Sequence, residues 1–115
     1  MPLKRGDIVL LPFPWTDLKG YSLRPALVIS DDSHNKNNAD AIFLFITTKE
    51  HKGMFDFMLR NTDPSYTKTG LKAASTFRMG KLATLEQKLA QRHLGYADAN
   101  LLKKIEAGLK LLLNL

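Results

Sequence analysis

The sequence predicts a mainly β protein with some α: a small antiparallel β-barrel followed by a C-terminal helix. The first three-quarters of the chain hold short runs of β-branched and aromatic residues, bounded by Gly, Pro, Asn and Asp. After Asp98 the hydrophobic residues change to helical spacing. The length of 115 residues is typical of one domain, so we expect a single domain over residues 1–115.

Five segments are predicted to be strands: 7–13, 26–31, 41–47, 55–59 and 74–79, the last running on into 82–85. Turn-forming residues dominate 33–40 and 61–70, and both segments are interpreted as loops. The apolar side chains around the fourth strand are interpreted as strand and core residues; these are Met54, Phe55, Phe57 and Met58.

The C-terminal segment is predicted to be an amphipathic helix capped by Asp98. A carboxylate at that position accepts hydrogen bonds from the first backbone N–H groups of a helix. Leu101, Ile105 and Leu109 recur at helical spacing and form an apolar stripe. Gly108 lacks a side chain, which permits close packing of this helix on the sheet.

Composition narrows the classes of function. The chain has no cysteine, which excludes disulfides and thiolate metal sites and fits a cytoplasmic protein. No apolar segment reaches the roughly 20 residues that a transmembrane helix needs, so we expect the chain not to span a membrane. The net charge of +6 and pI of about 9.7 favour an anionic partner: nucleic acid, an anionic membrane or an acidic protein.

Several kinds of catalytic site are missing from the sequence. His34, His51 and His93 have no metal-ligand spacing with one another, and no nucleophile elbow or phosphate loop is present. An enzyme with this sequence is therefore expected to work without a metal, a cofactor or a protein nucleophile. Ribonuclease chemistry meets that condition, because the RNA 2′-hydroxyl is itself the nucleophile.

Two residues suit phosphate chemistry by type and position. Arg24 precedes Pro25 and the apolar run 26–29, and proline biases the residue before it towards extended backbone. A guanidinium held at the mouth of a strand can donate two hydrogen bonds to a phosphate. Thr47 ends the apolar run 41–46, where its hydroxyl can bond the same group. The alternatives are a surface ion pair for Arg24 and an ordinary strand-end residue for Thr47.

The order of motifs resembles the MazF/PemK family of toxin endoribonucleases. The segment Arg5-Gly6-Asp7-Ile8 is followed by Arg24-Pro25-Ala26-Leu27-Val28, and the apolar run 41–45 by Ile46-Thr47-Thr48. Further matches are Gly70-Leu71-Lys72, Ser75-Thr76-Phe77-Arg78, Lys81-Leu82-Ala83-Thr84-Leu85 and His93-Leu94-Gly95. The similarity covers nearly the whole chain.

The resemblance implies an SH3-like barrel with appended helices, assembled as a homodimer that cleaves single-stranded RNA. Arg24 and Thr47 match the family's active-site pair. Thr48, Arg78 and Lys81 are the further candidates for substrate contacts, Arg78 having a barrel-surface charge as its alternative. Its expected partners are single-stranded RNA and an acidic antitoxin protein, with DNA contacted only through the antitoxin.

The sequence departs from the family pattern at two places. Gly80 stands where some relatives carry an acid, and the first loop lacks the Gly-Ser-Glu-Gln element common in the family. Asp17, in that loop, is a candidate replacement for the missing acid. For Trp15 the alternatives are stacking on an unpaired base, closure of the barrel or contact with a partner. The second functional hypothesis is a non-catalytic SH3-like module that binds nucleic acid or protein, since a fold does not determine a function.

Overall fold

The computed structural model describes residues 2–12, 22–49 and 53–115. The described elements are, in order, β1 (Asp7–Pro12), β2 (Leu23–Val28), α1 (Asp32–Asn37), β3 (Asp40–Thr47), β4 (Phe57–Leu59), α2 (Tyr66–Thr69), β5 (Ser75–Glu86), the 3₁₀ turn η1 (Gln87–Leu89), β6 (Arg92–Tyr96) and α3 (Ala99–Leu113). The predicted class, mainly β with a C-terminal helix, is confirmed.

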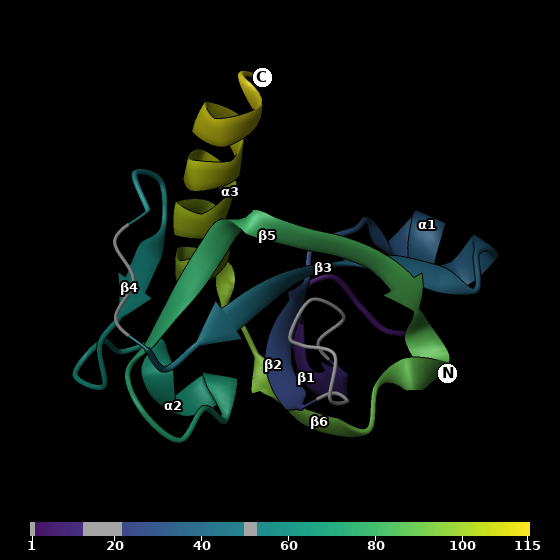
Figure 1. Cartoon of the computed structure of the whole chain (residues 1–115), viewed down its shortest axis with the longest axis horizontal. Helices are drawn as coiled ribbons and strands as arrows, with labels where there is room; N and C mark the ends of the chain where they lie inside the picture. The colour runs from purple at the N-terminus through teal and green to yellow at the C-terminus, as the bar shows by residue number, and fades with distance from the viewer. Residues whose placement is uncertain (1, 13–21, 50–52) are drawn as a thin grey trace.

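The strands form one curled antiparallel sheet with the order β4-β5-β3-β2-β1-β6. Figure 1 shows β5 bending near its middle, so that its second half passes over the inner strands. The bend coincides with a bulge in the pairing of β5 with β3. Leu44 lies opposite Leu82 and Ile46 lies opposite Phe77, which leaves residues 78–81 of β5 opposite Phe45 alone. Such bulges bend a strand and redirect its side chains.

Both faces of the sheet are packed, because apolar side chains alternate along the inner strands. One cluster lies between the sheet and the helices; it contains Ile8, Leu27, Leu44, Ile46, Leu59, Leu71, Phe77, Met79, Ala97, Leu101 and Ile105. The other lies inside the curl; it contains Val9, Leu11, Ala26, Val28, Ala41, Phe43 and Phe45. The end of the second cluster borders the candidate site described below.

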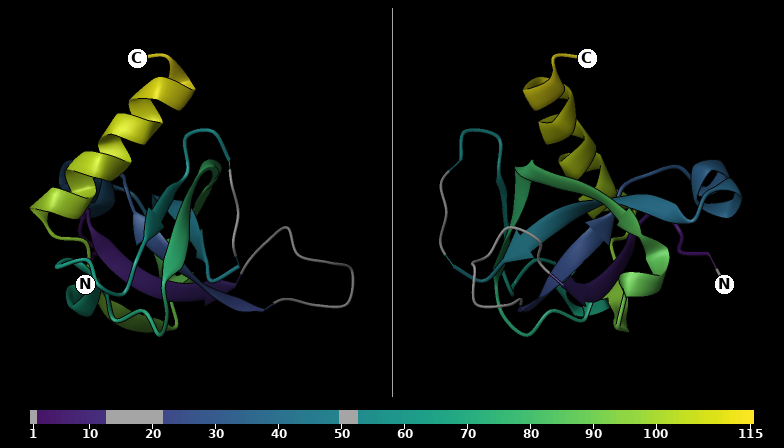
Figure 2. Two further views of the ribbon diagram at one scale, coloured as in Figure 1. Left: turned by 90° about the vertical axis from the view of Figure 1, so that its left-hand side faces the viewer. Right: turned by 45° about the vertical axis from the view of Figure 1, so that its right-hand side comes forward.

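Helix α3 forms as the sequence predicts, and it stands against one side of the sheet (Figure 2). Asp98 is the N-cap: its side chain accepts a 3.0 Å hydrogen bond from the backbone N–H of Leu101. A Cβ atom on Gly108 would lie 2.9 Å from the Phe55 carbonyl oxygen and 3.1 Å from Met79 Cγ. The close helix–sheet approach predicted at Gly108 is therefore confirmed.

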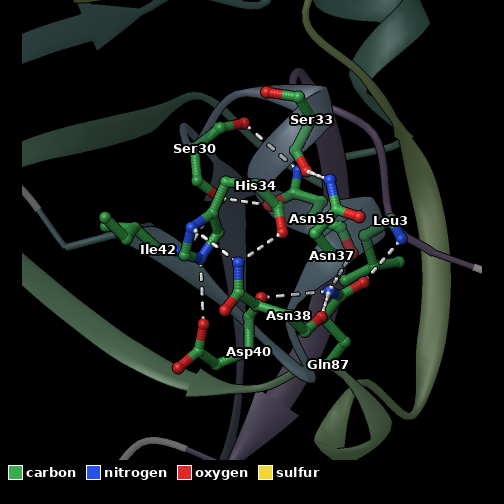
Figure 3. A network of polar contacts seen from close by, with 10 residues as sticks. All are labelled: Leu3, Ser30, Ser33, His34, Asn35, Asn37, Asn38, Asp40, Ile42 and Gln87. Carbon is green, nitrogen blue, oxygen red and sulfur yellow. Dashed lines mark hydrogen bonds and ion pairs between the residues drawn. The ribbon is translucent and has the colours of Figure 1, made fainter.

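The loop predicted over residues 33–40 is wrong, because most of it is helix α1. Asp31 caps this helix by accepting from the backbone N–H of Ser33 at 2.9 Å. Asn35 is buried, and its side chain bonds Ser30 twice, at 2.6 Å to the hydroxyl and 3.2 Å to the carbonyl oxygen. Polar residues that favour loops in general are held in a helical turn here by the surrounding network (Figure 3).

Gln87 anchors the other side of this network. Its Nε2 lies within 3.1 Å of the carbonyl oxygens of Asn35, Asn38 and Asp40, and its Oε1 accepts from the backbone N–H of Leu3 at 2.7 Å. One side chain from the first residue of η1 thus joins the N-terminal segment to α1 and the start of β3, as Figure 3 shows.

Two further expectations are wrong, and one strand was not foreseen. The predicted loop 61–70 contains the short helix α2, which ends at Gly70 with a left-handed φ of 71°. Strand β6 was not predicted, because its five residues lack a β-branched pattern and the strand forms by pairing with β1. Met54 is 89% exposed and lies outside the core. Among the described residues, no helix combines the length and apolarity needed to cross a membrane.

Candidate functional site

Arg24 and Thr47 lie at the ends of neighbouring strands and line one pocket of about 230 Å³. In the register of β2 with β3, Ala26 lies opposite Phe45. The same register continued by two residues brings Arg24 opposite Thr47, on the same face of the sheet as Phe45. The two predicted active-site candidates therefore meet for a reason of topology, although they are far apart in the sequence.

The β5 bulge brings two more predicted residues to this pocket. Arg78 and Lys81 belong to the stretch 78–81 that faces Phe45 alone, and both line the same pocket as Arg24 and Thr47. A regular strand would alternate these side chains strictly between two faces. The bulge instead places a guanidinium and an ammonium together across the pocket from Arg24.

The Thr47 hydroxyl has a defined orientation. Its oxygen accepts a 3.1 Å hydrogen bond from the backbone N–H of Lys49, at the turn that ends β3. A hydroxyl that accepts one hydrogen bond still carries a proton with which it can donate. Thr47 is therefore suited to donate to an anionic oxygen bound in the pocket.

The electrostatic character of the pocket is strongly positive. Four of the described lining residues are cationic, and the remaining three are neutral; the cations are Arg24, Lys49, Arg78 and Lys81. Positive charges gathered in a cleft with apolar walls attract a polyanion and raise its local concentration. Lys49 was missed by the sequence reasoning, although its place two residues after Thr47 could have indicated it.

Arg78 forms an ion pair behind the pocket. Its Nε lies 3.6 Å from Oδ2 of Asp56, whose side chain is only 9% exposed. Asp56 does not line the pocket with Arg24; it lines a neighbouring pocket that also contacts Arg78. The sequence reasoning did not identify this aspartate, because nothing in the local sequence connects residue 56 with residue 78.

Thr48 does not share the pocket of Thr47. Consecutive residues at a strand end point to opposite faces, and Thr48 lines a second pocket of about 310 Å³. That pocket combines apolar walls from Leu10, Leu23 and Leu94 with the cations Lys72 and Arg92. Trp15 and Asp17 lie outside the described residues, and their assignment stays a prediction.

Two of the sequence motifs meet in space away from the site. A Cβ atom on Gly70 would lie 2.0 Å from the carbonyl oxygen of Leu94, so only glycine fits between α2 and β6. This contact fixes α2 against the edge of the sheet beside the second pocket. Within residues 2–12, 22–49 and 53–115, no group of three or more His, Asp or Glu side chains is arranged to hold a metal ion.

The sequence profile of one protein family matches residues 4–113; that family is described as the PemK-like, MazF-like toxin of type II toxin–antitoxin systems. Among curated proteins, none matches this chain by sequence.

Solved structures from a mycobacterial species and from Deinococcus radiodurans share the fold. An endoribonuclease in complex with its cognate antitoxin from a mycobacterial species is 21% identical with a TM-score of 0.77, over 98% of this chain and 96% of that one. MazF from Deinococcus radiodurans is 20% identical with a TM-score of 0.77, over 100% and 99% of the two chains. A MazE–MazF structure from the same organism is 22% identical with a TM-score of 0.76, over 100% of this chain and 99% of that one. Since the family profile spans nearly the whole sequence, this chain belongs to the PemK-like, MazF-like toxin family.

Proposed function

We propose that this chain is the toxin of a type II toxin–antitoxin pair and acts as a metal-independent endoribonuclease on single-stranded RNA. The observation that carries the proposal is that Arg24, from β2, and Thr47, from β3, line one pocket together with three further cations. Family membership supports the same activity. So do the structural relatives that are themselves described as endoribonucleases.

The proposed reaction begins with attack of the RNA 2′-oxygen on the adjacent phosphorus. The P–O5′ bond breaks, leaving a 2′,3′-cyclic phosphate on one product and a 5′-hydroxyl on the other. A base takes the 2′-hydroxyl proton, and the departing 5′-oxygen gains one. Negative charge rises on the phosphate oxygens as the fifth bond forms, so fixed donors aimed at those oxygens stabilise the transition state.

We assign Arg24 and Thr47 to that stabilisation. The Arg24 guanidinium is permanently charged and can bond two phosphate oxygens at once. The Thr47 hydroxyl donates a hydrogen bond to the same phosphate or to the leaving oxygen, while its own oxygen accepts a hydrogen bond from the Lys49 backbone N–H. Arg78 is a second contact to the scissile phosphate, and Lys81 and Lys49 hold neighbouring phosphates. Thr48 contacts the adjacent nucleotide from its own pocket. Asp17 is the proposed proton acceptor and Trp15 a stacking residue, both on the basis of sequence alone.

The proposal is tested by incubating the pure protein with single-stranded RNA, with and without EDTA. We expect cleavage in both, cyclic-phosphate and 5′-hydroxyl ends, and no cutting of a DNA of the same base sequence, which lacks the 2′-hydroxyl. The Arg24→Ala variant, purified in the same way, controls for a contaminating nuclease. Cleavage that needs Mg²⁺, or cutting of the DNA, would exclude this mechanism. RNA binding without any cleavage would favour the non-catalytic module instead.

We further propose that the chain works as a cytoplasmic homodimer. Several large apolar side chains are exposed around the end of α3, among them Met54 at 89%, Leu111 at 65% and Leu115 at 88%. Exposed apolar patches of this kind mark interaction surfaces, and two-fold dimers are the commonest assemblies that cover them. Light scattering that gives the mass of one 12.9 kDa chain at micromolar concentration would contradict this proposal.

Inhibition by an acidic antitoxin segment completes the proposal. Structures of relatives with a cognate antitoxin and with MazE support a protein inhibitor. The cationic pocket is complementary to an acidic peptide, and a segment that folds on binding can cover a long groove. DNA would be contacted only through the antitoxin, and no membrane is involved. An antitoxin that inhibits while leaving Arg24 accessible to RNA would contradict occlusion of the site.

A further inference from the structure

Arg78 lies between two pockets. On one side it lines the cationic pocket with Arg24 and Thr47. On the other side it lines a second space of about 300 Å³, together with Asp56, Gly80 and Leu112. The position of the guanidinium between these two spaces determines what it can reach on the Arg24 side.

Asp56 is held in place by contacts other than the one with Arg78. Its backbone N–H donates to the Gly53 carbonyl oxygen at 3.1 Å, which closes a turn just before β4. Its Oδ1 accepts from the backbone N–H of Met79 at 3.0 Å. A Cβ atom on residue 53 would lie 2.5 Å from Asp56 Oδ2, so the glycine leaves the space that the carboxylate occupies.

The second carboxylate oxygen then faces the guanidinium. Asp56 Oδ2 lies 3.6 Å from Arg78 Nε, and the Asp56 side chain is more buried than that of Arg78, at 9% against 26% exposed. Met79 adjoins Arg78 in the sequence, so Asp56 holds both the backbone and the side chain of the bulge in β5. At 3.6 Å this contact is an ion pair and not a hydrogen bond, and its electrostatic attraction draws the Nε edge of the guanidinium towards the carboxylate.

We propose that Asp56 is a positioning residue for the RNA-cleaving site: it orients Arg78 towards the scissile region without touching the substrate. The inference rests on the proposed endoribonuclease function. Its importance follows from the bulge, because β5 loses its regular pairing at 78–81 and cannot by itself fix where Arg78 points. A displacement of about 1 Å in such a group costs up to about 10²-fold in rate.

The test compares Asp56→Asn with Asp63→Asn, a matched control elsewhere in the fold. Asp63 also accepts a backbone N–H through Oδ1, from Ser65 at 2.9 Å, and also pairs with a cation through Oδ2, Lys104 at 3.6 Å. Both substitutions keep the side-chain shape and an accepting oxygen while removing the charge. Asp56→Asn should lower kcat for RNA cleavage by about tenfold or more with KM changed less. Asp63→Asn should leave both within twofold.

A double-mutant cycle separates positioning from general stability. In an Arg78→Ala background, Asp56→Asn should have no further effect on kcat, because the group that Asp56 orients is gone. Loss of activity that persists undiminished in that background would overturn the proposal. So would equal activities of wild type and Asp56→Asn.

A readout independent of cleavage keeps this proposal distinct from the proposed function. The side-chain Nε–H signal of Arg78 is assigned in the ¹⁵N-labelled protein by its absence in Arg78→Ala. Its hydrogen exchange with water should accelerate in Asp56→Asn and stay unchanged in Asp63→Asn. If wild type cleaves no RNA but this signal responds as expected, the function fails and the orienting contact stands. An unchanged signal in Asp56→Asn would overturn the orienting contact whatever the activity.

Discussion

The Ser65 hydroxyl and the Leu101 backbone N–H donate to the same oxygen of Asp98, at 2.7 Å and 3.0 Å. The other carboxylate oxygen lies 3.1 Å from Lys68 Nζ. Asp98 is therefore more than the N-cap of α3, because it also joins the start of that helix to the segment that carries α2. The side chain is 17% exposed, so it is partly protected from water.

Asp98→Ala is expected to lower the free energy of unfolding by about 1–2 kcal/mol. Loss of an N-cap typically costs about 0.5–2 kcal/mol. The upper part of that range applies here because the buried Ser65 hydroxyl also loses its acceptor. Asp98→Asn should cost less, since an amide oxygen can still accept from Leu101. Urea unfolding measures both changes, and equal losses in the two variants would contradict the capping role.

Acid should remove the contribution of Asp98 to the free energy of unfolding. The hydrogen bonds from Leu101 N–H and Ser65 hold the pKa of Asp98 below its ordinary value. The folded state thus binds a proton less readily than the unfolded chain, so stability from this group is complete above the unfolded pKa of about 3.9. It is lost as the pH falls through the lower folded pKa. The gap in stability between wild type and Asp98→Asn should therefore be constant above about pH 5 and shrink in acid. A gap that does not change with pH would contradict this.

Gly108→Ala is expected to destabilise the protein although alanine favours helices. The helical preference alone would contribute about 1 kcal/mol of stabilisation. The new Cβ would lie 2.9 Å from a backbone carbonyl oxygen at Phe55 that cannot move freely, and overpacking of this kind costs about 1–3 kcal/mol. Gly80→Ala is the control, because a Cβ there meets nothing within 4 Å. Thermal unfolding should show a lower Tm for Gly108→Ala and little change for Gly80→Ala.

The inner strands and α3 could be predicted from the sequence, because the residue patterns that specify them lie within each segment. In α3, Asp98 is the N-cap and Leu101 and Ile105 belong to the buried apolar stripe. Both features depend only on residues within the helix segment. Helix α1 and strand β6 could not be predicted in this way. The first depends on Gln87, far along the chain, and the second depends on the edge of β1.

In the candidate site too, residues with a local sequence signal could be predicted, and residues that depend on distant contacts could not. The Arg-Pro pair and the end of an apolar run indicated Arg24 and Thr47, and the antiparallel register brought them together. The role of Asp56 could not be predicted from the sequence, because its contact with Arg78 depends on the pairing of β4 with β5 and on the bulge in β5. Thr48 is adjacent to Thr47 in the sequence, but the alternation of side chains places the two residues in different pockets.

Arg24→Ala and Thr47→Val should each reduce RNA cleavage by about 10²–10³-fold, as expected for loss of one preorganised donor. Arg24→Lys should recover little, because an ammonium lacks the planar fork that bonds two oxygens. Thr47→Ser should recover most of the activity, because it restores the hydroxyl. Arg60→Ala, which removes a cation from an exposed position, is the control. Steady-state kinetics on a short RNA measure all five variants, and wild-type rates in Arg24→Ala would exclude its assignment.

The salt dependence of binding should identify which cations meet phosphates. The logarithm of the affinity for a single strand falls with the logarithm of salt concentration by about 0.7 for each phosphate neutralised. Lys81 and Lys49 line the cationic pocket, whereas Lys88 is 80% exposed and pairs with Glu86 at 3.1 Å. With a single-stranded DNA as uncut probe, Lys81→Ala and Lys49→Ala should each lower the slope by about 0.7. Lys88→Ala should leave it unchanged. If all three slopes equal that of wild type, the pocket does not hold the backbone phosphates, and the basic charge of the chain acts only at long range.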